Sequence, residues 1–183
     1  MKQSPACQKP LSWDQLDLSN YNLVFLPGGH EKGVRQIIDA PKIHSLLSAY
    51  VPLTLKPSKH ALAAVCHGVM VLANTKDASG CGKSVLHDKT TTALAGGHEQ
   101  GIFWATRAVL GDYYKTYGAE SKSVEESVKK VLDEPEKQWK GSLGFSPLVV
   151  RDERFNYVSA RFPGDVPEMC KVLVEMVNGL VKA

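Results

Sequence analysis

Residues 61–73, with the sequence ALAAVCHGVMVLA, constrain the fold more than any other stretch of the chain. The run is apolar without interruption up to Cys66, and after His67 and Gly68 its apolar residues follow a helical pattern. A short, continuous apolar run is typical of a strand buried on both faces, as in a parallel sheet covered by helices. The stretch therefore predicts a strand over residues 61–66 that passes directly into a helix over residues 67–74.

The rest of the sequence alternates in the same way between short apolar runs and helical patterns. Strand patterns lie at residues 21–26, before the turn Pro27-Gly28-Gly29, at residues 89–95, and as a pair within residues 146–162 that is joined at Asp152-Glu153. Helical patterns lie at residues 33–50 with a break at Pro41, at 97–111, after the capping-box pair Ser123 and Glu126, and at 165–181. This alternation predicts an α/β fold with a mostly parallel sheet. We expect one domain over residues 1–183, in which residues 1–20 form an irregular N-terminal segment.

Composition excludes several classes of partner. The net charge is only +3, and Lys and Arg are scattered among Asp and Glu, so no nucleic-acid partner is expected. No apolar run reaches the roughly 18 residues of a membrane helix, and the N-terminus lacks the apolar stretch of a signal peptide. The four cysteines form no CxxC motif or cluster, so we expect neither a metal site nor disulfides. These features predict a cytoplasmic protein, and no cofactor is expected.

Cys66 lies at the point where the predicted strand turns into the predicted helix. This is the geometry of a nucleophile elbow, in which small neighbours such as Ala64 and Gly68 allow a close approach of the backbone. The free N–H groups at a helix N-terminus favour a thiolate, so we expect a lowered pKa and the highest reactivity among the four thiols. The alternative is a buried cysteine that serves only as a small apolar side chain.

Three motifs together resemble the ThiJ/PfpI superfamily, which is related to the class I glutamine amidotransferases. They are YNLVFLPGGH at residues 21–30, AAVCHG at 63–68 and SARFPGD at 159–165. The resemblance implies a flavodoxin-like three-layer sandwich in which Cys66 is the reactive residue. It also matches His67 to the histidine that follows the nucleophile in the protease- and glyoxalase-like branches. The sequence contains no His-x-Glu pair of the amidotransferase branch, so glutamine hydrolysis is not expected.

The same resemblance implies the surroundings of the cysteine. The backbone amides of Gly28, Gly29 and His67 are expected to form the oxyanion hole. Pro163 and Gly164 match a turn that lines the mouth of the pocket, and we expect His30 to line the same pocket.

The N-terminal part departs from the superfamily. Members normally open with a strand and a helix before the PGGH turn, and the turn after that strand often supplies a glutamate that hydrogen-bonds the cysteine. Here about 20 residues precede the first strand pattern, so the chain is expected to be either truncated or a shortened member with a reduced sheet. Glu31 and Glu99, each within a GGHE sequence, are the nearest substitutes, but we expect both to be solvated surface carboxylates. An uncovered sheet edge would favour a homodimer.

Three classes of function follow from these residues. The first is an enzyme in which Cys66 attacks small reactive carbonyls, as a glyoxalase does, or amide bonds, with His67 moving the proton. The second is a redox-sensing or protective protein with an oxidisable Cys66. The third is a paralogue that keeps the fold but has weakened chemistry.

Overall fold

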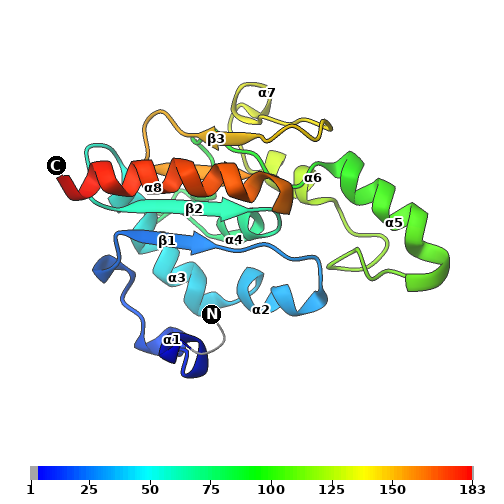
Figure 1. Ribbon diagram of the computed structural model, residues 1–183, viewed down its shortest axis with the longest axis horizontal. Helices are drawn as coiled ribbons and strands as arrows, with labels where there is room; N and C mark the ends of the chain where they lie inside the picture. The colour runs from blue at the N-terminus through cyan, green and yellow to red at the C-terminus, as the bar shows by residue number, and fades with distance from the viewer. Residues whose placement is uncertain (1–3, 183) are drawn as a thin grey trace.

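The computed structural model describes residues 4–182, which form a four-stranded sheet with helices on both faces (Figure 1). The strands are β1 (Leu23–Leu26), β2 (Ala61–Val65), β3 (Val149–Arg151) and β4 (Tyr157–Ala160). Their order across the sheet is β1-β2-β4-β3, with β1, β2 and β4 parallel and β3 antiparallel to β4. The predicted α/β fold with a mostly parallel sheet is confirmed.

The central strand β2 separates two apolar cores. Its residues are completely buried up to Ala64, and alternate side chains point to opposite faces. Leu62 and Ala64 pack in the larger core with α4 (Gly68–Asn74), whereas Ala63 and Val65 pack in the smaller core with α8 (Val166–Lys182). Because both faces of β2 are covered, its sequence has no polar alternation.

The helices follow the predicted patterns closely. The pattern at residues 33–50 is broken at Pro41, because proline cannot continue a preceding helix. Pro41 instead occupies the first turn of α3 (Pro41–Tyr50). The Ser123 side chain accepts a hydrogen bond from the Glu126 amide, and the Glu126 carboxylate accepts one from the Ser123 amide, as a capping box requires. The remaining α-helices are α1 (Pro5–Gln8), α2 (Arg35–Ile38), α3 (Pro41–Tyr50), α5 (Gly96–Leu110), α6 (Val124–Lys129) and α7 (Pro135–Gln138).

The strand predicted at residues 89–95 is not present. The segment makes only an isolated bridge between Thr91 and Trp139, and it is otherwise tied to β4 through side chains. The Thr91 hydroxyl lies 2.8 Å from the Tyr157 hydroxyl, and the Thr92 amide donates to the Ser159 hydroxyl. The Thr91 hydroxyl and the Thr92 amide therefore serve tertiary contacts rather than a strand ladder.

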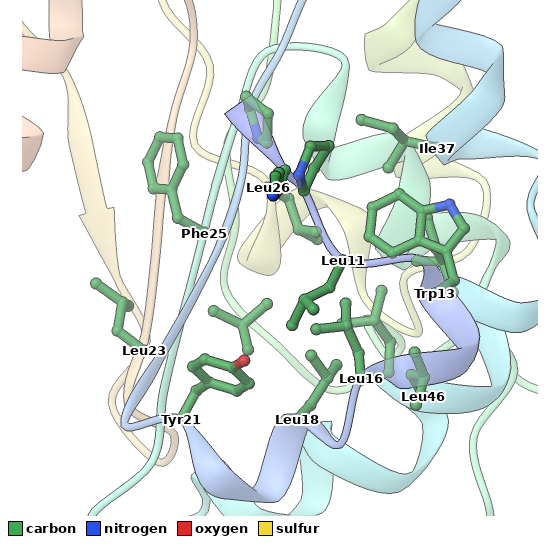
Figure 2. Close-up of a pocket in the computed structure, with 16 residues that line it drawn as sticks. Leu11, Trp13, Leu16, Leu18, Tyr21, Leu23, Phe25, Leu26, Ile37 and Leu46 are labelled. Carbon is green, nitrogen blue, oxygen red and sulfur yellow. The ribbon is translucent and has the colours of Figure 1, made fainter. Parts of the chain in front are cut away.

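The N-terminal segment lies beside the outer edge of β1 (Figure 2). It consists of α1 and two 3₁₀ turns, Trp13–Gln15 and Leu18–Asn20; residues 1–3, which belong to the predicted irregular segment, fall outside the described residues. Its Leu11 and Trp13 face Leu26 and Ile37 across an apolar groove of about 480 Å³. Within residues 4–182 no strand pairs with this edge of β1.

Candidate functional site

Cys66 lies at a sharp turn between β2 and α4. Its φ of 57° is positive, and among the described residues it is the one non-glycine residue with this property. A side chain in the left-handed region costs of order 1–3 kcal/mol, and such residues concentrate at functional sites. The backbone geometry thus matches the elbow that the sequence predicted.

Two glycines make this turn sterically possible. A Cβ on Gly68 would lie 2.3 Å from the carbonyl oxygen of Leu26, and a Cβ on Gly28 would lie 2.5 Å from the Cβ of Cys66. Both distances are far inside van der Waals contact. The turn after β1 and the turn after β2 therefore approach each other so closely that only glycine fits at these positions.

The side chains of Cys66 and His67 contact each other in a buried environment. The Sγ of Cys66 lies 3.4 Å from the Nδ1 of His67. Cys66 is 9% exposed and His67 is 1% exposed. A thiol and an imidazole at this distance can exchange a proton directly.

The pKa of the Cys66 thiol is raised to about 11, and the predicted lowering is wrong. Burial is the largest cause, because it disfavours the thiolate. The backbone amides of His67 and Gly29 stabilise the thiolate in part, while the charge of Glu99 opposes it. The sequence argument considered the amides at the helix N-terminus but not the loss of hydration, which outweighs them.

The pKa of His67 moves in the opposite direction, to about 4. Burial disfavours the imidazolium, and the positive charges of His30 and Lys115 add to the effect. At neutral pH the pair is therefore a neutral thiol beside a neutral imidazole. In this state His67 can accept the thiol proton.

Cys66 opens into a cavity of about 390 Å³. Pro163 lines this cavity, as the resemblance implied, and so does His30, as expected. Gly164 is not among the lining residues; a Cβ there would lie 2.6 Å from the ring of Phe162. The other lining residues are Leu94, His98, Glu99, Ile102, Tyr114, Phe145 and Phe162.

Glu99 is a buried residue of this cavity, so its expected place on the solvated surface is wrong. It is 4% exposed and forms an ion pair with the completely buried Lys115, at 3.2 Å. Its other carboxylate oxygen accepts a hydrogen bond from the Val124 amide at 2.8 Å. A carboxylate with these partners can remain in a low-dielectric site.

Glu31, in contrast, is exposed, as expected. Its carboxylate accepts a hydrogen bond from the Gly33 amide and caps the short 3₁₀ turn Lys32–Val34. The two GGHE sequences are therefore in different structures, because the second one forms the first turn of α5.

His98 also lines the cavity, although it is not among the site residues predicted from the sequence. Its Nε2 lies 3.0 Å from the carbonyl oxygen of Leu143, and its ring stacks on Phe145 at a centroid distance of 5.6 Å. These partners belong to the loop at residues 142–146, which is fixed by hydrogen bonds from Arg161. The guanidinium of Arg161 donates to three carbonyl oxygens of this loop and to both carboxylate oxygens of Asp165.

The motif SARFPGD has a structural explanation in the same contacts. Arg161 and Asp165 are completely buried and form an ion pair at 2.9 Å across the turn that contains Pro163. Burial alone would raise the pKa of Asp165, but the hydrogen bonds from Arg161 outweigh it and keep the pKa low. The pair fixes Pro163 at the edge of the cavity.

The part of the chain that the structure describes contains no group of three or more His, Cys, Asp or Glu side chains arranged to hold a metal ion. It also contains no helix long and apolar enough to cross a membrane.

The model of the family described as "ThiJ/PfpI family-like" matches residues 1–142, which is most of the chain. The chain belongs to the ThiJ/PfpI-like family. This result agrees with the resemblance of the motifs around Gly28 and Cys66.

One curated relative is similar in sequence over most of this chain. The uncharacterized protein C14C4.04 of Schizosaccharomyces pombe is 29% identical over 159 residues, which are 86% of this chain and 51% of that protein. The chain thus spans about half the length of this curated relative.

Two solved structures are similar in fold. The Rapid Encystment Protein 24 KDa of Francisella tularensis has a TM-score of 0.68 at 18% identity, over 94% of this chain and 65% of that one. Glyoxalase III of Candida albicans has a TM-score of 0.61 at 16% identity, over 90% of this chain and 60% of that one. The flavodoxin-like fold of the family is thereby established for this chain.

Proposed function

We propose that this chain carries the active site of a cysteine-dependent enzyme that converts small 2-oxoaldehydes to 2-hydroxy acids without glutathione. The observation that carries the proposal is the contact of 3.4 Å between Cys66 and His67 on a strained turn that opens into a cavity. The similarity in fold to a glyoxalase III supports this choice of reaction.

The first step is addition of the thiol to the aldehyde. As Sγ of Cys66 bonds to the aldehyde carbon, its proton moves to Nδ1 of His67, whose ring is uncharged at neutral pH. The aldehyde oxygen gains the negative charge and takes up the proton from His67, giving a hemithioacetal. The backbone amides of Gly29 and His67, which already point at the sulfur, are suitable donors to this oxygen.

The second step moves hydrogen within the bound substrate. His67 takes the proton from the aldehyde carbon and returns it to the neighbouring ketone carbon, while the hydroxyl proton of the hemithioacetal moves to the ketone oxygen; the product is a thioester of Cys66. The first carbon is oxidised and the second is reduced, so no external oxidant or cofactor is needed. Water then cleaves the thioester, which releases the 2-hydroxy acid and restores the thiol.

Glu99 supplies the carboxylate of this proposed site. The family glutamate that the sequence lacks would hydrogen-bond the cysteine, and Glu99 is the carboxylate that lines the same cavity. Its ion pair with Lys115 and its bond from Val124 fix its position. We assign it an electrostatic role, since its negative charge raises the pKa of the Cys66 thiol.

The environment of Cys66 favours this enzyme over a redox sensor. Reversible oxidation follows thiolate character and exposure. Cys66 has neither property, because the residue is only 9% exposed and the pKa of its thiol is raised. An enzyme overcomes both obstacles, since the substrate enters the cavity and His67 removes the proton during attack.

We also propose that the 183-residue chain forms a homodimer through the outer edge of β1. This edge has no partner strand within residues 4–182, and beside it Tyr21 and Phe25 are 43% and 41% exposed. Unpaired strand edges with apolar neighbours favour association. Light scattering at micromolar concentration should give twice the chain mass of 20.0 kDa, and a clean monomer would contradict the proposal.

The function is tested with methylglyoxal and no glutathione. Purified protein should form a covalent adduct at Cys66, seen by peptide mass spectrometry, and should release lactate. Cys66→Ala should abolish both, whereas Cys81→Ala, which changes an exposed thiol, should preserve both. Lactate formation that survives Cys66→Ala, or no lactate from the unaltered chain, would overturn the proposal.

A further inference from the structure

We infer that the Cys66 cavity selects 2-oxoaldehydes with an aryl or bulky apolar substituent over methylglyoxal. This inference rests on the proposed function and adds the class of substrate to it. It follows from the size, the lining and the charge of the cavity.

The cavity is larger than methylglyoxal requires. Its volume of about 390 Å³ falls within the range of roughly 300–1,000 Å³ that is typical of pockets for much larger ligands. Methylglyoxal presents a single methyl group beyond its two carbonyls. Such a substrate would leave most of the cavity to water.

Aromatic and apolar side chains surround the space next to Cys66. The ring of His30 packs on Tyr114, with centroids 4.5 Å apart. The ring of His98 packs against Phe145 at 5.6 Å and Phe162 at 5.5 Å. A planar aryl group can contact both sets of rings through stacked or edge-to-face arrangements.

Two polar groups of the cavity are already engaged. Glu99 is held by Lys115 and the Val124 amide, and Nε2 of His98 lies within hydrogen-bond distance of the Leu143 carbonyl. No arginine or lysine is among the lining residues, so the cavity offers no guanidinium or ammonium partner for a substrate carboxylate or phosphate. A charged substituent would lose its hydration here without such a partner, whereas an apolar one would gain by burial.

Ile102 and Phe145 provide a direct test of the contact between the aryl group of the substrate and the cavity. Both line the cavity, and both are partly exposed, at 44% and 84%, so their truncation should leave folding intact. Val109 is on the same helix as Ile102, is 88% exposed and does not line the cavity, which makes Val109→Ala a matched control.

The experiment compares kcat/KM for phenylglyoxal and methylglyoxal by chromatography of mandelate and lactate. The ratio of rates with free N-acetylcysteine corrects for the different electrophilicity of the two aldehydes. We expect a corrected preference for phenylglyoxal of roughly tenfold or more, since even one methylene in an apolar pocket changes kcat/KM by about 10–200-fold. Ile102→Ala and Phe145→Ala should reduce this preference by several-fold, and Val109→Ala should not change it.

The outcomes separate the two proposals. Cys66-dependent lactate formation with no corrected preference for phenylglyoxal would overturn the inference and leave the proposed function intact. A preference that both cavity variants retain would also overturn it, because the ring would then bind elsewhere. If neither lactate nor mandelate forms, the proposed function and the inference are both overturned.

Discussion

The Sγ of Cys66 and the Nδ1 of His67 lie 3.4 Å apart, and both residues are buried. Burial raises the pKa of the thiol to about 11 and lowers the pKa of the imidazole to about 4. The resting pair is therefore uncharged at neutral pH. Activation of the nucleophile depends on transfer of one proton during attack rather than on a stable thiolate.

Alkylation by iodoacetamide tests this resting state. We expect Cys66 in the folded protein to react more slowly at pH 7 than the exposed Cys81, whose pKa is lowered by hydrogen bonds from the Ser79 side chain and the Lys83 backbone. The rate at Cys66 should rise with pH up to about 11. Peptide mapping measures both sites, and the difference should vanish in denaturant. Preferential labelling of Cys66 at pH 6 would show that it is a thiolate after all.

The buried pair Glu99–Lys115 leads to a second prediction. Glu99→Gln leaves the ammonium of Lys115 buried without its counter-charge, and breaking a buried pair in this way costs about 3–5 kcal/mol of unfolding free energy. Glu31→Gln is the matched control, because Glu31 is exposed and should change the free energy by less than about 0.5 kcal/mol. Urea denaturation measures both.

A double variant separates charge from packing. Combining Glu99→Gln with Lys115→Met removes both charges, so part of the lost stability should return. Equal stabilities of the Glu31→Gln and Glu99→Gln variants would mean that Glu99 is solvated, as the sequence had suggested.

The elbow itself could be predicted because it depends on neighbouring residues. A continuous apolar strand, a cysteine and then a glycine specify the turn locally, and Gly28 and Gly68 fit the required close approach of the two turns. The break at Pro41 and the cap at Ser123 were predictable for the same reason, since each depends on residues within one helical turn.

The electrostatics of the site could not be predicted in this way. Glu99 is buried because Lys115 and Val124, which are distant in sequence, meet its carboxylate. The thiol of Cys66 is desolvated because several elements close around it. Nothing in the local sequence of either residue encodes these contacts, since Glu31, which ends an identical GGHE sequence, is exposed.

Substitution of Gly68 tests the steric basis of the elbow. In Gly68→Ala the new Cβ would lie 2.3 Å from the Leu26 carbonyl oxygen, so the backbone must move. We expect a loss of at least about 1–3 kcal/mol in unfolding free energy, together with loss of Cys66 adduct formation. Gly101→Ala is the control: no atom lies within 4 Å of its Cβ position and it is inside α5, so it should stabilise the protein by about 0.5–1 kcal/mol. Thermal and urea unfolding distinguish the two, and similar effects would refute the close approach.

The lowered pKa of His67 predicts a specific acid sensitivity. The unfolded chain binds a proton at this histidine near pH 6.5, whereas the folded chain binds it only near pH 4. Stability is therefore lost as the pH falls from 6.5 through 4, because the unfolded state takes up the proton first. The full difference corresponds to about 3 kcal/mol. His67→Gln, which cannot take up this proton, should show a smaller decrease over the same interval in urea titrations at successive pH values. If both proteins lose the same free energy between pH 6.5 and pH 4, burial does not lower the pKa of His67 in the folded protein.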